Sequence, residues 1–154
     1  MNNWFRKLVL FVTGFCVYIT IENCYRGYSF WLMGIVGGLV MLILDSVNNR
    51  LSWDIDMSVY GLIGMTSVTA FELIIGELLK WLNQPAMWDY SNMPFNFDGV
   101  ICLPFSIAWF FLSYLGVFLA DSINYYVFEE LPVPYYKVFG KTIIRFKEKK
   151  CKLK

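Results

Sequence analysis

WDYSNMPFNFDG, residues 88–99, is a polar and turn-rich stretch that lies between two segments apolar enough to cross a membrane. The segment before it, residues 59–82, carries Glu72 and Glu77. A carboxylate at membrane depth costs about 2.5–3.5 kcal/mol on insertion scales unless a partner or water receives it. We therefore expect Glu72 to take a proton, to pair with Arg26 or to face a water-filled pocket. These segments predict a helical membrane protein.

Composition supports a membrane protein and excludes several other classes. The 154 residues are 58% apolar and 16% charged, whereas soluble domains are about 25% charged. Thirteen Lys and Arg nearly balance twelve Asp and Glu, so we expect no nucleic-acid partner. The chain has no His and its four Cys form no CxxC pair, which argues against zinc, haem and His-based catalysis. We expect no cofactor, no metal site and no catalytic residue.

Four apolar windows are long enough to cross the hydrocarbon as helices. They are residues 4–21, 28–44, 59–82 and 100–119. The predicted fold is an all-α integral membrane protein, a four-helix transmembrane bundle with an ordered outer loop between the third and fourth helices. Gly34 and Gly38 form a GxxxG pattern in the second window, which serves either packing within one bundle or dimerisation.

Basic residues gather near both ends of the chain and predict its orientation. Arg6 and Lys7 precede the first window, and residues 137–154 form a basic tail. By the positive-inside rule both termini are expected in the cytoplasm, with residues 1–136 as the transmembrane domain of a multi-pass protein of the cell membrane. Asp45 and Asp121 would then lie at inner helix ends, where they are expected to meet water.

A group of polar side chains is expected to meet in the outer half of the bundle. Glu22 and Arg26 are four residues apart and can pair on one helix face. Asp89 and Asn96 are of the type that holds turns, and the aromatic residues of the loop can pack on the helices. The expected members of this polar site are Glu22, Arg26, Glu72, Trp88, Asp89, Tyr90 and Asn96. Their role is either a structural network or a ligand or ion site.

Several motifs carry a family resemblance that covers about residues 8–136. They are ENCYRG (22–27), FELIIGE (71–77), WDYSNMPFNFDGVICLPFSIAW (88–109) and VPYY (133–136). In these motifs the chain resembles the CmpB-like family of ABC-transporter type IV proteins. The resemblance implies a small multi-pass membrane protein with permease-like function. The residues that match its motifs are Glu22, Arg26, Glu72, Trp88, Asp89, Tyr90, Ser91, Asn96, Gly99 and Cys102.

Three functions remain open at this point. The first is a membrane transport component whose acidic site receives a cation or a small polar solute. Four spans hardly enclose a path, so it would act as a homo-oligomer, with another membrane subunit or with an ATPase subunit. The second is a membrane scaffold or regulatory subunit that transports nothing. The third is an integral membrane enzyme that acts on lipid headgroups through Glu22, Glu72 and Asp89, although no catalytic motif supports it. Membrane lipids are partners in every case.

Overall fold

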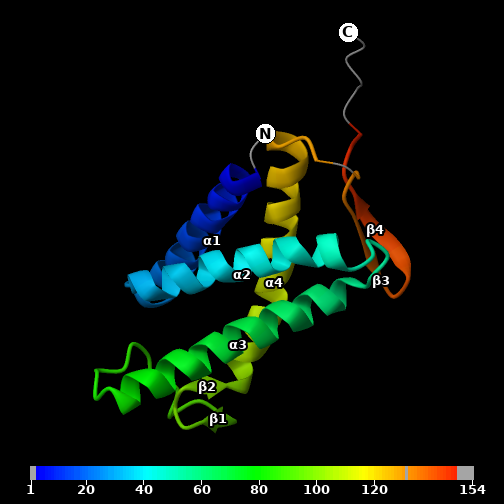
Figure 1. Cartoon of the computed structure of the whole chain (residues 1–154). Coiled ribbons are helices and arrows are strands. Elements are labelled where there is room, and N and C mark those ends of the chain that lie inside the picture. Colours follow the sequence, from blue (N-terminus) through cyan, green and yellow to red (C-terminus); the bar gives the residue numbers. More distant parts are fainter. Residues whose placement is uncertain (1–2, 131, 149–154) are drawn as a thin grey trace.

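Four α-helices make up most of the computed structural model, which describes residues 3–130 and 132–148 (Figure 1). They are α1 (Asn3–Arg26), α2 (Trp31–Arg50), α3 (Met57–Trp81) and α4 (Leu103–Ser122), which continues into a π-helical turn, η1 (Ile123–Val127). In the described chain, α1, α3 and the segment from α4 to η1 are long and apolar enough to cross a membrane, whereas the apolar part of α2, Trp31–Val47, is shorter. A mostly helical, multi-span architecture is thus confirmed.

Local sequence signals explain where the helices begin and end. The Asp56 carboxylate accepts a hydrogen bond from the Ser58 backbone N–H at 3.0 Å and caps the start of α3. Pro104 lies in the first turn of α4, where its missing N–H is not needed. After α1, Gly27 has a φ of +80°, a conformation that favours glycine. Several helices extend a few residues beyond the predicted apolar windows. The polar residues next to those windows still form helical turns.

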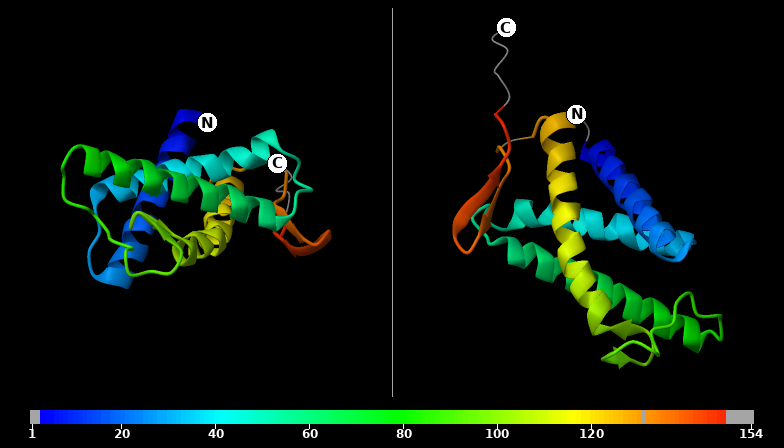
Figure 2. Two further views of the ribbon diagram at one scale, coloured as in Figure 1. Left: turned by 90° about the horizontal axis from the view of Figure 1, so that it is seen from below. Right: turned by 180° about the vertical axis from the view of Figure 1, so that it is seen from behind.

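In Figures 1 and 2 the start of α1 lies beside the end of α4, and the end of α2 lies beside the start of α3. We group the helix termini into a loop end and a terminal end. The loop end contains the end of α1, the start of α2, the end of α3 and the start of α4. There the rings of Tyr25 and Phe105 lie 5.6 Å apart. The terminal end contains the opposite helix ends, and Arg6 there contacts Asn124. Successive helices therefore run in alternating directions, and the start of α1 lies beside the end of α4.

Small residues allow the helices to approach closely. A Cβ at Gly34 or Gly38 of α2 would overlap the rings of Phe15 or Phe11 of α1. The GxxxG pattern therefore serves packing within one bundle. On the other side, a Cβ at Gly64 of α3 would overlap Ser113 of α4. Side-chain packing and close backbone contact, instead of a hydrophobic drive, hold helices together in lipid.

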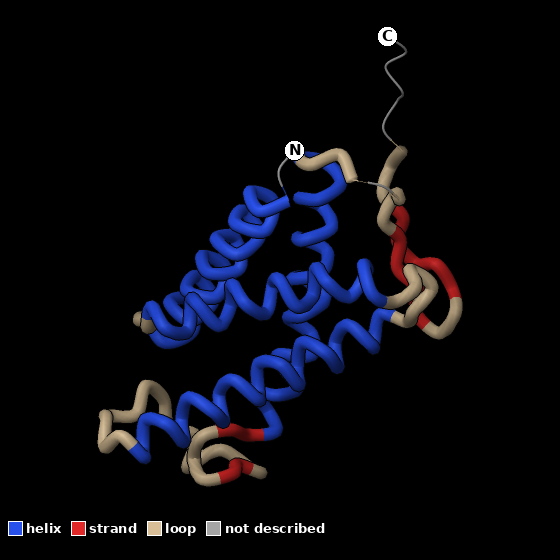
Figure 3. The backbone as a smooth tube through the Cα atoms, viewed as in Figure 1, coloured by secondary structure: helices blue, strands red, loops and turns tan. Residues whose placement is uncertain are grey.

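The few strands are short and lie beyond the helix ends (Figure 3). In the loop between α3 and α4, β1 (Asn96–Phe97) pairs with β2 (Ile101–Cys102) in antiparallel fashion. Near the C-terminus, β3 (Tyr135–Val138) pairs with β4 (Lys141–Arg145). The predicted all-α fold did not include these two hairpins.

The hairpin of β3 and β4 changes the interpretation of the basic tail. It crosses the predicted domain boundary at residue 136, and Phe139 and Gly140 at its turn both have positive φ, as tight hairpin turns require. The Tyr136 hydroxyl donates to Asp121 Oδ2 at 2.7 Å, and the Phe146 and Phe118 rings lie 5.1 Å apart. Burial of these aromatic residues against α4 orders a segment that was predicted to be a simple basic tail. Residues 149–154 of that tail lie outside the described chain.

Candidate functional site

A pocket of about 410 Å³ opens at the loop end between α1, α4 and the loop that precedes α4. Five of the seven residues predicted for the polar site line it, namely Glu22, Arg26, Trp88, Asp89 and Tyr90. The other lining residues are mostly aromatic or apolar and come chiefly from α1 and α4. The structure therefore brings most of the predicted site together around one cavity.

The Glu22–Arg26 pair forms one wall of the pocket. Arg26 Nη2 donates to Glu22 Oε1 at 2.8 Å, which confirms the predicted pairing along one helix face. Ser29 donates to the other oxygen of Glu22. Arg26 Nη1 also donates to the Met87 backbone carbonyl at 3.1 Å and thereby ties α1 to the loop. The guanidinium lies 4.7 Å from the centre of the Tyr28 ring, within range of a cation–π interaction.

Glu72 lies behind the pocket wall and is only 1% exposed. Trp109 Nε1 donates to its Oε1 at 3.2 Å, and the Tyr90 hydroxyl donates to the same oxygen at 3.3 Å. Within the described chain, Glu72 Oε2 has no hydrogen-bond partner. The predicted alternative of a pair with Arg26 is wrong, because the Arg26 guanidinium is held by Glu22 four residues away on the same helix.

Tyr90 is the second donor to Glu72. Its burial raises its pKa above the ordinary value, and the nearby Glu72 carboxyl raises this pKa further. The phenol therefore keeps its proton and remains a donor. The Tyr90 ring is stacked on Phe105 of α4, with centroids 4.7 Å apart, so its hydroxyl is held in a fixed position.

The loop itself is held by the side chains that the sequence pointed to. Asp89 Oδ1 accepts hydrogen bonds from the Ser91 backbone N–H at 2.8 Å and from the Ser91 hydroxyl at 2.5 Å. These bonds lower the pKa of Asp89, so the carboxylate is ionised at neutral pH. Asn96, which does not line the pocket, donates from Nδ2 to the Met93 carbonyl at 2.8 Å, and Trp88 Nε1 donates to the Val100 carbonyl at 2.7 Å. An ordered loop packed on the helices is confirmed.

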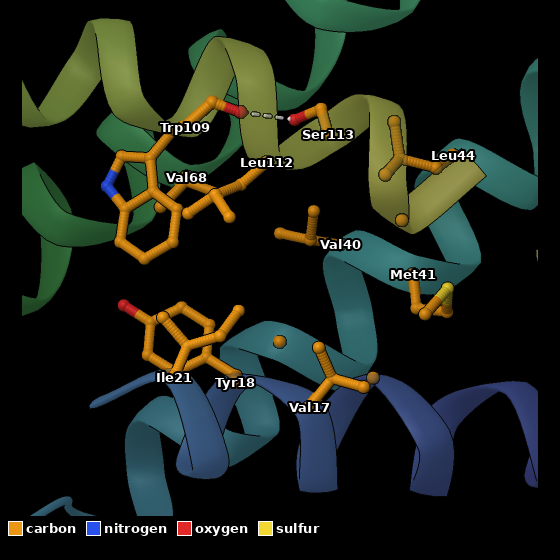
Figure 4. Close-up of a pocket in the computed structure, with 13 residues that line it drawn as sticks. Val17, Tyr18, Ile21, Val40, Met41, Leu44, Val68, Trp109, Leu112 and Ser113 are labelled. Carbon is orange, nitrogen blue, oxygen red and sulfur yellow. Dashed lines mark hydrogen bonds between the residues drawn. The ribbon is translucent and has the colours of Figure 1, made fainter. Parts of the chain in front are cut away.

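A smaller apolar cavity of about 70 Å³ adjoins the pocket (Figure 4). Ile21, Trp109 and Leu112 line both hollows. Tyr18 of α1 lies opposite Trp109 of α4, with ring centroids 5.2 Å apart, and Ser113 donates to the Trp109 carbonyl at 2.7 Å. The Trp109 side chain therefore lines both the polar pocket and the apolar cavity, and its indole N–H donates to the buried Glu72.

A second polar cluster at the terminal end was missed by the sequence reasoning. Arg6 Nη1 donates to Asp45 Oδ1 at 2.8 Å and to Asn124 Oδ1 at 3.0 Å, and Asn124 Nδ2 donates to the same Asp45 oxygen at 2.6 Å. Arg6 Nε lies 3.1 Å from Glu130 Oε1. Asp45 was predicted to meet water at a helix end, but it is 5% exposed, and Asp121 is 3% exposed. Both predictions are wrong because α1 and the hairpin cover these helix ends.

The sequence did contain a signal for this cluster: Arg6 lies near the start of the first helix and Asp45 near the end of the second, and antiparallel helices bring these ends together. Arg6 was used only to predict the orientation of the chain in the membrane. In the described residues no group of three or more His, Cys, Asp or Glu side chains could hold a metal ion.

Comparison with known protein families gives a match over most of the chain. A family model described as "Putative ABC-transporter type IV" (ABC_trans_CmpB) matches residues 11–146, which is most of the chain. No curated protein and no solved structure gives a significant match.

Proposed function

Because the chain belongs to this ABC-transporter type IV (CmpB) family, we propose that it is a permease-like membrane transport component. The observation that carries the proposal is the pocket of about 410 Å³ in which charged side chains from α1 and the loop meet aromatic walls. Such a cavity, mostly apolar with a few convergent polar groups, is the usual form of a small-molecule site.

The charges and walls of the pocket favour a cation or a small polar solute. Glu22 and Arg26 neutralise each other, whereas Asp89 adds a negative charge. Trp88 and Tyr90 supply ring faces that can attract a cation. A cation would therefore meet a net negative charge and aromatic surfaces together. We also propose that this site lies in the outer half of the bundle.

The proposal includes the topology. We propose that α2 crosses the membrane together with the three longer spans, because the alternating helix directions place its ends at opposite ends of the molecule. An even number of spans places both termini on one side, and the basic residues near the two ends assign that side to the cytoplasm. Substituted cysteines test this. Labelling of Asn92→Cys from outside and of Cys151, beyond the described residues, from inside is expected, and labelling of both from one side contradicts the topology.

The protein is proposed to act as a homo-oligomer, or with another membrane subunit or an ATPase subunit. The pocket is open at the loop end, and four helices leave little room for a closed path through one chain. Large apolar side chains on α3 and α4, such as Ile74, Phe111 and Leu115, are exposed and available to lipid or to such partners. Co-purification of an ATPase would favour an energised transporter.

Flux measurements test the transport function directly. Purified protein in phospholipid vesicles is given a gradient of either a monovalent inorganic or an organic cation, and the uptake of that cation is measured. Glu22→Gln is expected to reduce the uptake, since it removes the charge that neutralises Arg26 in the pocket wall. Glu77→Gln is the matched control, because Glu77 lies on the exposed surface of α3 and pairs with Lys80 outside the pocket. Equal cation uptake by vesicles with and without protein would contradict the proposal.

The second candidate is a scaffold or regulatory subunit that transports nothing. The observation that favours it is the hairpin of β3 and β4, which presents Lys141, Arg145 and the fully exposed Phe139 at the terminal end. A soluble signalling protein that co-purifies with the wild type and is lost when Lys141 and Arg145 are replaced by Ser would favour this function over transport.

A further inference from the structure

Glu72 combines deep burial with an unsatisfied carboxyl oxygen. Its Oε1 accepts two hydrogen bonds from neutral donors, whereas Oε2 has no hydrogen-bond partner within the described residues. No described Lys or Arg lies within ion-pair distance of it. A buried carboxylate without a cation is unfavourable, so the protonated acid is the stable form of such a group. Its proton would reside on Oε2.

The ionisable groups that face Glu72 come from α1 and from the loop. Tyr18, Glu22 and Arg26 face it from α1, and Tyr90 faces it from the loop. Glu22 disfavours a second negative charge nearby, whereas Arg26 favours one. Because Arg26 is already paired with Glu22, its attraction for Glu72 is largely offset. Trp109, which faces Glu72 from α4, carries no charge.

The two donors to Glu72 are also walls of the pocket. Tyr90 and Trp109 line the cavity, and both donate to Glu72 Oε1. A molecule that enters the cavity contacts these two side chains and changes their hydrogen bonds to Glu72. A positive charge in the cavity would also favour the ionised form of Glu72. The pocket and the buried acid are therefore connected through the same pair of side chains.

We propose that Glu72 is a proton-binding residue whose proton is exchanged for a cation in the pocket. In this step the O–H bond at Glu72 Oε2 breaks, the proton passes to water, and the carboxylate charge balances the entering cation. When the cation leaves, Oε2 takes a proton back. The inference rests on the proposed function for the identity of the pocket, but the proton site itself is measurable without any flux.

The first experiment measures the proton. Wild-type protein in phosphatidylcholine nanodiscs is titrated with pH while the infrared carbonyl stretch of protonated carboxylic acids is recorded. A band that is present at neutral pH and disappears as the pH rises is expected, and it should be absent in Glu72→Gln. Glu77→Gln is the matched control on the same helix and should retain the band, since Glu77 is half-exposed and paired with Lys80. A band that persists in Glu72→Gln would overturn the proposal.

A second variant protects the test against a folding failure of Glu72→Gln. Tyr90→Phe removes one donor to Oε1 and so disfavours the carboxylate. The midpoint of the wild-type band is therefore expected to shift to higher pH in this variant. An unchanged midpoint would show that the titrating acid is not the one that Tyr90 contacts, and it would overturn the assignment.

The third experiment measures the exchange. Tetramethylammonium carries a positive charge but no ionisable proton, so any proton released on its addition comes from the protein. Addition to weakly buffered wild-type nanodiscs is expected to acidify the solution, and addition to Glu72→Gln is not. Absence of release in the wild type would overturn the exchange. Proton release without cation uptake by the vesicles would contradict the transport function alone, whereas uptake that is independent of pH and of Glu72 would contradict this inference alone.

Discussion

Removal of Arg6 should destabilise the protein strongly, because Arg6 pairs with Asp45 inside the terminal end. The two side chains are 8% and 4% exposed and lie 2.8 Å apart. In Arg6→Met the Asp45 carboxylate stays buried without its cation, and the loss of one partner from a buried ion pair costs about 3–5 kcal/mol. Asn124 still donates to Asp45, so the lower half of that range is expected.

Replacement of the other partner should cost less. In Asp45→Asn, Arg6 keeps Asn124 as an acceptor and Glu130 as a counter-ion, the latter at 3.1 Å. The main loss is then one charge-assisted hydrogen bond, about 1.5–3 kcal/mol. The double variant has neither charge buried, so its loss should be smaller than the sum of the single losses by about 0.5–3 kcal/mol.

Reversible denaturant unfolding in detergent micelles, followed by tryptophan fluorescence, measures these differences. Lys80→Met is the matched control, because its partners Glu77 and Asp98 are solvent-exposed and such pairs contribute little. The reasoning would be refuted if Arg6→Met lost no more stability than Lys80→Met. Strict additivity of the Arg6 and Asp45 variants would equally show that the two side chains are not coupled.

Three further predictions concern the helix contacts and the loop. Gly64→Ala should lower the melting temperature in detergent because its Cβ would overlap Ser113, whereas Gly116→Ala, whose Cβ would meet only one flexible side chain, should be tolerated; equal losses would contradict the close contact of α3 and α4. Trp88→Phe keeps an aromatic ring but loses a half-buried hydrogen bond to a backbone carbonyl, so a loss of about 0.5–1.5 kcal/mol is expected in denaturant unfolding. Asp89 has a lowered pKa in the folded loop, so its contribution is complete above its usual pKa of 3.8 and is lost as the pH falls through the folded value. Proteolysis of the loop should therefore increase in acid for the wild type but not for Asp89→Asn.

Local signals in the sequence were sufficient to predict the helices and the hydrogen bonding within the loop. Four apolar windows indicated the four helices, and the spacing of Glu22 and Arg26 indicated their ion pair. Asp89 and Asn96 were recognised as turn-holding residues because their hydrogen bonds reach only a few positions along the chain. These features depend on neighbours in sequence, and such neighbours are visible without a structure.

Contacts between distant segments were not visible in the same way. The partners of Glu72 come from the loop and from α4, whereas the sequence offered as a pairing partner Arg26, a cation expected on the same side of the membrane. Asp45 lies at a helix end like many solvated residues, and contacts with α1 and η1 bury it. The ordering of β3 and β4 depends on aromatic packing against α4, which the alternation of basic and apolar residues does not encode.

The contact between Arg6 and Asn124 has a consequence for biogenesis. The two residues are 118 positions apart, so α1 is held by a segment that is synthesised much later. Until residue 124 has been synthesised, the nascent chain must hold Arg6 and Asp45 together without the amide that bridges them. A chain released before residue 124 would therefore lack the amide that bridges this ion pair. The fold at the terminal end can thus be completed only after residue 124 has been synthesised.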